Sequence, residues 1–265
     1  MRFVTVCIAI AVGLALAATA RAHWDLGDPH KMHYPQLPDA TGWDIDMTRF
    51  LLADDWKCSK SGNVDDIHFW YSVKGDMGTQ PLPPLHFNTV HVSIHANMPA
   101  NAAGGGAPYS RPGALLWQGN FDVTAAMING PFPGDEGWDL PTPNPIPGSI
   151  NPDCVMVDHI WYWQLNITDI EDPFLQKEGE IYWLDLQVLG APTDHLVGWK
   201  TTPGIYEDAA VYATPDGQFP WTPIAVCDMD NRTDLAFVIT PEPATLALMG
   251  LGLGGLVLRR VRRKR

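Results

Sequence analysis

Residues 64–73 read VDDIHFWYSV, and this stretch decides the fold class. In an extended strand Ile67, Phe69 and Tyr71 would share one face, because successive side chains point to opposite sides. The opposite face would carry Asp66, His68, Trp70 and Ser72. Such alternation is typical of a β-strand with one face in a core. We therefore expect Trp70 to be exposed unless a second layer covers it.

Further strands are predicted on both sides of this one. Residues 90–95 alternate in the same way between apolar residues and His91, Ser93 and His95. The other predicted strands are Ala114–Trp117, Ile160–Ile167, Glu180–Leu189, Ala209–Ala213 and Leu235–Thr240. The regions between them lack a helical period of useful length. Many short strands separated by turns predict an all-β fold, an antiparallel β-sandwich of the jelly-roll kind.

Two stretches between the predicted strands have the composition of long loops. Residues 99–112 contain three consecutive glycines, outside any strand-turn-helix context that would indicate a nucleotide site. Residues 131–152 contain seven prolines. Because proline cannot donate to a sheet ladder, we expect residues 131–152 to run over the surface or cap one end of the fold.

The charge balance limits the classes of partner. The 265 residues carry 30 acidic and 17 basic side chains, a net charge of −13. A nucleic-acid-binding protein needs a basic face for the phosphates, so the balance argues against that class.

The N-terminal 22 residues have the composition of a secretory signal peptide. Arg2 precedes an apolar run from Phe3 to Ala18, and Ala20-Arg21-Ala22 forms a small-x-small cleavage site. The sequence therefore predicts cleavage after Ala22 and a mature chain that begins at His23.

The C-terminus combines three features in order. Pro241-Glu242-Pro243 precedes an apolar stretch, residues 244–258, and the basic tail RRVRRKR, residues 259–265. As a helix the apolar stretch would span about 22 Å at 1.5 Å per residue, less than the ~30 Å hydrocarbon core of a bilayer. We expect a short transmembrane helix that anchors the chain in transit, with its basic tail in the cytoplasm.

Residues 241–265 closely resemble the PEP-CTERM sorting signal of Gram-negative envelope bacteria. The resemblance implies processing near Pro241-Glu242-Pro243 by a membrane-embedded exosortase, in organisms that make exopolysaccharide. It implies an address in the outer envelope or extracellular matrix rather than an activity. A plain tail anchor is the alternative.

Removing both ends leaves one expected exported domain, residues 23–240. It holds 9 basic and 29 acidic side chains, a formal charge of −20, and all 11 tryptophans of the chain. Such a surface keeps a protein soluble outside the cell. Tryptophans serve both in β-sandwich cores and on sugar-binding faces, so composition leaves both roles open.

The exported domain would keep three cysteines, Cys58, Cys154 and Cys227. In an oxidising compartment three thiols allow one disulfide, with three possible pairings. Their spacing is too wide for a CxxC zinc or redox motif. We expect Cys58 to pair with Cys154, because each lies near a predicted strand.

Acidic and histidine side chains supply candidate metal ligands. Asp228, Asp230 and Asp234 in CDMDNRTD suit calcium, although the EF-hand pattern fails and an Asx-rich turn is the alternative. We interpret Asp54-Asp55 and Asp65-Asp66 as carboxylates at strand ends, and metal ligation by them is the alternative. His91 and His95 would lie about 13 Å apart on one strand, too far to share an ion without His68 from a neighbouring strand.

Recognisable catalytic motifs are absent from the sequence. GxSxG, HExxH, paired CxxC and the P-loop do not occur. Glycoside hydrolysis needs two carboxylates across a cleft, and the many acids supply candidates without selecting a pair. The sequence nominates no catalytic residue.

The middle of the chain also resembles segments of uncharacterised exported proteins of planctomycete-like bacteria. The segments are GDPHKMHYPQLPD (27–39), GWDID (42–46), LADDWKCSKSG (52–62), DIHFWYS (66–72), YSRPGALLW (109–117) and DPFLQKEGEIYWLDLQV (172–188). The resemblance implies a single exported domain and carries no reaction with it.

These observations predict an exported, non-catalytic envelope or matrix protein that binds polysaccharide through exposed aromatic side chains, with Trp70 as the candidate contact. An exosortase is the expected processing partner. No cofactor is expected, with calcium at Asp228, Asp230 and Asp234 as the alternative. The alternative is a secreted polysaccharide-active enzyme, a glycoside hydrolase or lyase. Paired acids in a deep cleft would favour the enzyme, whereas an aromatic strip would favour binding.

Overall fold

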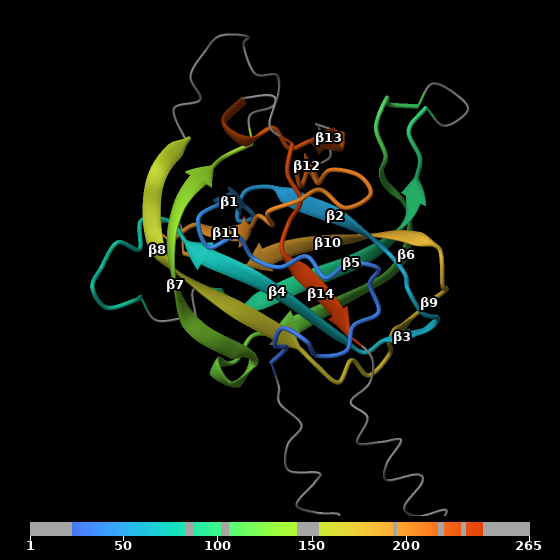
Figure 1. Ribbon diagram of the computed structural model, residues 1–265, viewed down its shortest axis with the longest axis horizontal. Coiled ribbons are helices and arrows are strands. Elements are labelled where there is room, and N and C mark those ends of the chain that lie inside the picture. The colour runs from blue at the N-terminus through green and yellow to red at the C-terminus, as the bar shows by residue number, and fades with distance from the viewer. Residues whose placement is uncertain are drawn as a thin grey trace, which may run out of the picture. The chain divides into compact units, whose positions relative to one another are not determined.

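The computed structural model describes residues 23–82, 87–101, 106–141, 154–192, 195–216, 220–228 and 232–240 (Figure 1). Within these ranges no helix has the length and apolar character that crossing a membrane requires. The predicted signal peptide and cleavage residue Ala22 lie outside them, as do Pro241, Glu242, Pro243 and the rest of the sorting signal.

The described residues form strands and two short 3₁₀ turns. The strands are β1 (Trp43–Asp46), β2 (Leu51–Lys57), β3 (Gly62–Val64), β4 (Asp66–Val73), β5 (Thr89–Met98), β6 (Arg111–Asp122), β7 (Ile128–Asp139), β8 (Val155–Ile167), β9 (Phe174–Gln176), β10 (Ile181–Leu189), β11 (Val197–Lys200), β12 (Val211–Ala213), β13 (Thr222–Pro223) and β14 (Phe237–Thr240). The turns are η1 (Ala125–Met127) and η2 (Val226–Asp228).

The first sheet closes on itself. Its order is β11-β1-β7-β8-β4-β14, and β11 also pairs with β4, which places Val197 opposite Val73 and Trp199 opposite Tyr71. Strands β11, β1, β7, β8 and β4 therefore form a ring. Its pairings are antiparallel except for the parallel pair β1 and β7. A closed ring turns one face of each strand toward a shared interior.

The second sheet is antiparallel throughout, in the order β13-β12-β2-β10-β5-β6. Strands β3 and β9 form a separate two-stranded pair. Apolar residues of both large sheets, among them Ile67 and Phe69 of β4 and Leu184 of β10, belong to one continuous core. The two sheets are thus held by burial of a common apolar interior.

The all-β, largely antiparallel architecture predicted from the sequence is confirmed. The jelly-roll sandwich stays a prediction, because the first sheet is closed by β11 and contains a parallel pair, which a simple two-layer arrangement does not require. The predicted strands correspond to β4, β5, β6, β8, β10, β12 and β14.

Most tryptophans fill the interior. Seven of the eleven are buried: Trp24, Trp56, Trp70, Trp138, Trp163, Trp183 and Trp199. Five of them are at most 1% exposed: Trp56, Trp138, Trp163, Trp183 and Trp199. Each indole buries a large apolar area, so the tryptophan content serves the core first.

The expectation that Trp70 is exposed is wrong. All eight residues of β4 are buried, and Trp70 is 5% exposed. The second layer is the N-terminal segment, residues 23–38, whose Trp24 ring meets the Trp70 ring edge to face with centroids 6.3 Å apart. The segment is fixed to the last strand by hydrogen bonds from the amide of Lys31 to the carbonyl of Ile239 (2.8 Å) and from Gln36 to Phe237 (3.2 Å).

The proline-rich stretch is also corrected in part. Residues 131–139 belong to β7, which pairs with β1 and β8 inside the first sheet (Figure 1), although Pro131 and Pro133 are exposed as expected and only residues 136–139 are buried. The β7–β8 ladder shifts register between Asn129 and Phe132 and again between Pro133 and Glu136. Prolines fit this strand because they fall where the ladder is interrupted. Residues 142–153 lie outside the described ranges.

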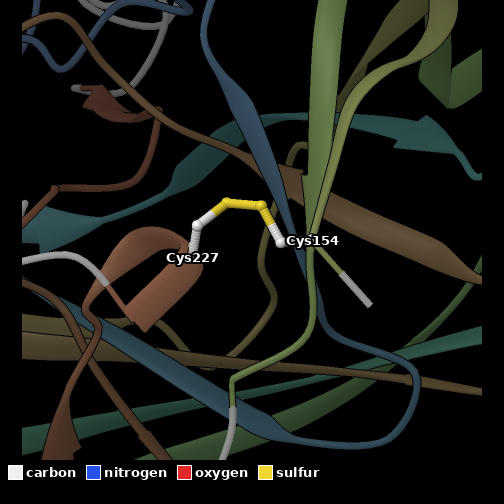
Figure 2. Close-up of a disulfide and its surroundings, with 2 residues drawn as sticks. All are labelled: Cys154 and Cys227. Carbon is white, nitrogen blue, oxygen red and sulfur yellow. A yellow bond between two sulfur atoms is a disulfide. The ribbon is translucent and has the colours of Figure 1, made fainter. Parts of the chain in front are cut away.

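The disulfide joins Cys154 to Cys227, with Cα atoms 5.3 Å apart (Figure 2). The predicted pairing of Cys58 with Cys154 is wrong. Cys58 is a buried free thiol at the end of β2, where its backbone pairs with Met32 and its Sγ donates to the carbonyl of Lys60 (3.2 Å). Nearness to a strand misled the prediction, because β2 and β8 belong to different sheets.

Candidate functional site

An aromatic pocket opens on the first sheet beside the N-terminal segment. Its volume is about 270 Å³, and it is lined by Trp24, Asp25, Leu26, Leu37, Pro38, Trp70, Asn129, Phe132, Tyr162 and Gln164. The wall therefore combines aromatic rings and aliphatic side chains with two amides and one carboxylate. Lysine and arginine are missing among these ten lining residues. An apolar wall with a few polar groups is the usual composition of a small-molecule site.

The pocket is built by contacts between β4, β7, β8 and the N-terminal segment. The rings of Phe132 and Tyr162 lie with centroids 5.4 Å apart and are partly exposed. The amide of Gln164 donates to the carbonyl of Trp24 (2.8 Å), which holds the N-terminal segment in place. The Oε1 atom of Gln164 is buried and has no hydrogen-bond partner among the described residues.

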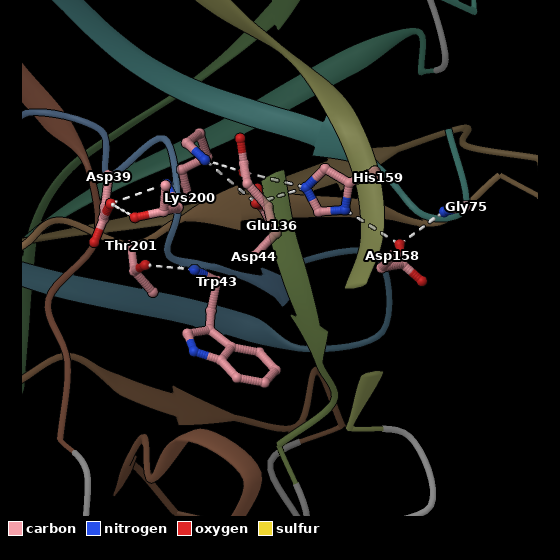
Figure 3. A network of polar contacts seen from close by, with 10 residues as sticks. Asp39, Trp43, Asp44, Gly75, Glu136, Asp158, His159, Lys200 and Thr201 are labelled. Carbon is pink, nitrogen blue, oxygen red and sulfur yellow. Dashed lines mark hydrogen bonds and ion pairs between the residues drawn. The ribbon is translucent and has the colours of Figure 1, made fainter. Parts of the chain in front are cut away.

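A buried charge cluster occupies the interior of the ring (Figure 3). We define it as Asp44 of β1, Glu136 of β7, His159 of β8 and Lys200 of β11, so that four ring strands contribute one residue each. All four are fully buried. Buried charges persist in proteins only when they are paired, so the four groups must be read together.

His159 and Lys200 lie on the same carboxylate oxygens. His159 Nε2 is 2.9 Å from Asp44 Oδ2 and 3.2 Å from Glu136 Oε2. Lys200 Nζ bonds to Glu136 Oε2 and lies 3.6 Å from Asp44 Oδ2. On its other side His159 Nδ1 faces Asp158 Oδ1 at 3.2 Å.

These contacts shift the protonation of the cluster strongly. Burial alone would raise the pKa of Asp44, but Lys200 and His159 hold it well below its usual range. Burial would lower the pKa of His159, yet the carboxylates of Asp44, Asp158 and Glu136 outweigh it and raise the pKa to about 11. Burial and the charge of Asp44 raise the pKa of Glu136 to about 7. The cluster therefore contains a fixed anion, an imidazolium and an acid that titrates near neutral pH.

Two glycines make room for the cluster. A Cβ atom on Gly134 would collide with the carboxylate of Glu136, and one on Gly198 would lie 2.8 Å from the Cβ of Asp44. Any other residue at these positions would displace a charged side chain from its partner.

Tyr162 connects the two features. Its ring lines the aromatic pocket, and Lys200 Nζ lies 4.5 Å from the ring centroid, within the range of a cation–π contact. The floor of the pocket is thus supported by a member of the buried charge cluster.

A second acidic group, the acidic corner, comprises Asp54, Asp55, Asp208 and Asp234. Asp54 accepts hydrogen bonds from the amides of Asp55 (2.8 Å) and Leu235 (2.6 Å), and Asp234 accepts one from Tyr206 (2.5 Å). Burial, followed by the charges of neighbouring aspartates, raises the pKa of Asp55 to about 9; burial, opposed by hydrogen bonds from Tyr206 and Ala210, raises that of Asp234 to about 8.

The calcium candidates from the sequence fall at this corner only in part. Asp234 belongs to it, Asp230 lies outside the described residues, and nothing is described of the Asp228 side chain. Asp65 and Asp66 are buried at the start of β4, where Asp65 pairs with Lys31 at 3.6 Å.

The candidate histidines are separated by the fold. His68 bonds to Asn166 (2.7 Å) in the first sheet, and burial lowers its pKa to about 4. His91 and His95 lie on β5 of the second sheet. In the described ranges, ligand atoms that could share a metal ion come together as Asp44, Glu136 and His159, and as Asp139 beside the disulfide-bonded Cys154 and Cys227. The second group is unsuitable because its sulfur atoms are bonded to each other.

Sequence reasoning missed the buried charge cluster. Glu136 lies in the stretch that was expected to be a loop. Asp44 and Lys200 lie in strands that alternate in period two but are only four residues long, too short to stand out in the sequence. The available signal was the charge itself, since a charged residue inside an otherwise apolar strand needs a buried partner.

Comparison with known proteins finds a family match for the domain and another for the C-terminal segment. Residues 240–263 match the PEP-CTERM protein-sorting motif, which confirms that resemblance and implies export and processing by an exosortase. The affiliation with planctomycete-like bacteria stays a prediction. No curated protein and no solved structure matches the chain. Because residues 32–240 match the family described as "Domain of unknown function (DUF7901)", the chain belongs to that family and ends in a PEP-CTERM sorting motif.

Proposed function

We propose that this exported protein binds an extracellular polysaccharide through the aromatic pocket and does not cleave it. The observation that carries the proposal is the composition of the pocket: four aromatic rings, three aliphatic side chains and a few hydrogen-bonding groups. Sugar rings present C–H groups on one face and hydroxyls at the edge. An aromatic wall with amides beside it is complementary to both.

The polar atoms support a ligand that donates hydrogen bonds. Gln164 Oε1 is a buried acceptor without a partner among the described residues, and such an atom costs free energy until a donor reaches it. Asn129 lies directly opposite Gln164 in the β7–β8 ladder and lines the same wall. A sugar hydroxyl or an acetamido N–H would supply the missing donor.

The size of the pocket supports recognition of one sugar unit. Its volume of about 270 Å³ lies below the ~300–1,000 Å³ typical of drug-sized ligand sites. Leu26 at the rim is 79% exposed, so the rest of a chain would continue into solvent.

The proposed address follows from the sorting motif. The mature protein would begin at His23, be anchored in the membrane in transit by its short C-terminal helix, and be released near Pro243 into the outer envelope or matrix. Exopolysaccharide would be the most abundant ligand there.

Retention of the full chain on the host's exopolysaccharide tests the proposal. We expect Phe132→Ala to weaken retention at least tenfold, because it removes a partly exposed ring from the wall while leaving the core in place. Tyr34→Ala is the matched control, since Tyr34 is 51% exposed and lies outside the pocket. Trp70→Ala is a poor test, because truncating a buried indole costs about 3–5 kcal/mol of stability.

Each result decides something. Failure of the wild-type chain to be retained, or equal losses in the Phe132 and Tyr34 variants, would refute binding through this pocket. Release of reducing ends by the wild-type chain would favour the alternative, a polysaccharide-active enzyme.

A further inference from the structure

The buried charge cluster has the geometry of a metal site. One ligand atom each of Asp44, Glu136 and His159 lies within 4.8 Å of the other two. The separations from His159 Nε2, 2.9 Å to Asp44 Oδ2 and 3.2 Å to Glu136 Oε2, suit neighbouring ligands of one ion. A tetrahedral ion that binds nitrogen and oxygen at about 2.0–2.2 Å sets its ligands about 3.4 Å apart, so the three side chains would move apart by only a few tenths of an ångström to bind it.

The imidazole of His159 is oriented as metal-binding histidines are. Its Nδ1 faces Asp158 Oδ1 at 3.2 Å, and this carboxylate oxygen is itself fixed by the amide of Gly75 at 2.7 Å. Metal-ligating histidines almost always donate their second N–H to such an acceptor, which leaves the first nitrogen aimed at the ion. In Figure 3 Asp158 lies on one side of the His159 imidazole, and the carboxylates of Asp44 and Glu136 lie on the other.

Two carboxylate oxygens are left over. Asp44 Oδ1 and Glu136 Oε1 are buried and have no hydrogen-bond partner among the described residues. A buried charged group with an unsatisfied oxygen is costly unless a cation reaches it. Lys200 contacts the same Oδ2 and Oε2 atoms that face His159, so an ion bound through these two atoms would leave Oδ1 and Oε1 as the acceptors for Lys200.

The formal charges agree with a divalent ion. With a neutral imidazole, Asp44, Glu136 and Asp158 carry three negative charges and Lys200 carries one positive charge. A divalent cation balances the remainder. In the metal-free cluster the imidazolium of His159 takes the place of that cation, and binding at Nε2 replaces its proton.

We propose that Asp44, Glu136 and His159 bind a zinc ion inside the ring, with Asp158 as the positioning residue for His159. Zinc suits a mixed set of imidazole and carboxylate ligands and a fully enclosed site. The ion would tie β1, β7 and β8 together. The proposed metal site does not rest on polysaccharide binding, although Lys200 of the cluster contacts the Tyr162 ring that lines the aromatic pocket.

Refolding the full chain with zinc alone tests the site. Because the ligands are fully buried, the ion must enter while the chain folds, so the chain is unfolded in urea with a chelator and refolded with or without Zn²⁺. We expect one tightly held zinc per chain by elemental analysis and a higher unfolding temperature. Cobalt in place of zinc should give visible absorption typical of a low-coordinate nitrogen and oxygen site.

Variants locate the ion. Glu136→Gln keeps the size of the side chain and should abolish stoichiometric binding. Asp158→Asn keeps all three ligands and should weaken affinity about 10–100-fold, which remains measurable if the ligand variant does not fold. Asp234→Asn in the acidic corner is the matched control and should bind zinc like the wild-type chain.

Two results would overturn the assignment. One is a refolded wild-type chain that holds no zinc after dialysis, which would leave Lys200 and the His159 imidazolium as the permanent cations of the cluster. The other is zinc that persists in Glu136→Gln but is lost in Asp234→Asn, which would place the ion in the acidic corner.

Discussion

Asp234 is a buried acid that forms no ion pair with a cation in the described part of the chain. The residue is fully enclosed, and its Oδ1 has no hydrogen-bond partner among the described residues. Burial raises the pKa of Asp234 to about 8, and that of Asp55 to about 9. Since the unfolded chain releases these protons near pH 4, the folded state binds more protons throughout the interval above it. The contribution of these two carboxyls to stability therefore falls as the pH rises from about 4 to about 8 for Asp234 and to about 9 for Asp55.

Replacing Asp234 with Asn should remove much of this loss. We expect Asp234→Asn to match the wild-type chain at pH 4.5 and to be more stable by about 2 kcal/mol or more at pH 7.5, because each pKa unit corresponds to about 1.4 kcal/mol. Urea unfolding at the two pH values, with a chelator present, measures the difference. A variant less stable than wild type at pH 7.5 would show that Asp234 is held as a paired anion.

The disulfide acts at the scale of elements. Cys154 precedes β8 of the first sheet and Cys227 lies in the turn η2, with 73 positions between them. Such a bridge stabilises a protein mainly by lowering the conformational entropy of the unfolded chain, and less through contacts in the native state. The bridge also ties the start of β8 to the turn η2 by a covalent bond.

Cys154→Ser should lower the free energy of unfolding by about 4 kcal/mol in the chain-entropy account of a loop of this length. Cys58→Ala is the control and should leave the bridge intact. Non-reducing peptide mapping should recover Cys154 joined to Cys227 and Cys58 as a thiol. Recovery of Cys58 in a disulfide would contradict the pairing.

The elements that the sequence predicts are those whose alternation reflects a single apolar face. β4, β5 and β10 contribute alternate residues to the common core, so period two is visible in them. β1 (WDID) and β11 (VGWK) also alternate, but each is only four residues long and carries a charged residue, Asp44 or Lys200, on the face opposite its apolar side chains. Reading charge as a sign of exposure fails wherever the interior is polar.

The candidate site depends on pairing between distant strands. Asp44 and His159 meet across 115 positions and Lys200 meets Glu136 across 64. Nothing local encodes these encounters; they follow from ring closure by β11 and from the parallel pair β1 and β7. The aromatic pocket likewise forms only after the N-terminal segment covers Trp70.

At the scale of the whole molecule, the two ends set the covalent form of the protein. The family match ends at residue 240, where the sorting motif begins. Thr240 is still part of β14, with its hydroxyl 3.3 Å from His68 Nε2. Processing near Pro241-Glu242-Pro243, as the sequence predicts, would therefore take place within a few residues of the folded domain.

Intact-mass analysis of envelope protein should find a chain that begins at His23 and lacks the residues after about Pro243. The reasons are the small-x-small site before His23 and the matched sorting motif. A mature protein that keeps RRVRRKR would contradict processing and indicate a plain tail anchor.

The position of β14 between β4 and the N-terminal segment has a consequence for the order in which the domain folds. β14 pairs with β4 on one side and receives the amides of Lys31 and Gln36 from the N-terminal segment on the other. A chain delivered only to residue 236 lacks the partner of both. The N-terminal segment therefore cannot complete these hydrogen bonds until β14, nearly the last part of the domain, is available, and the sorting motif follows β14 directly in the chain. The four-residue strand that completes the fold is thus the part of the domain that immediately precedes the sorting motif.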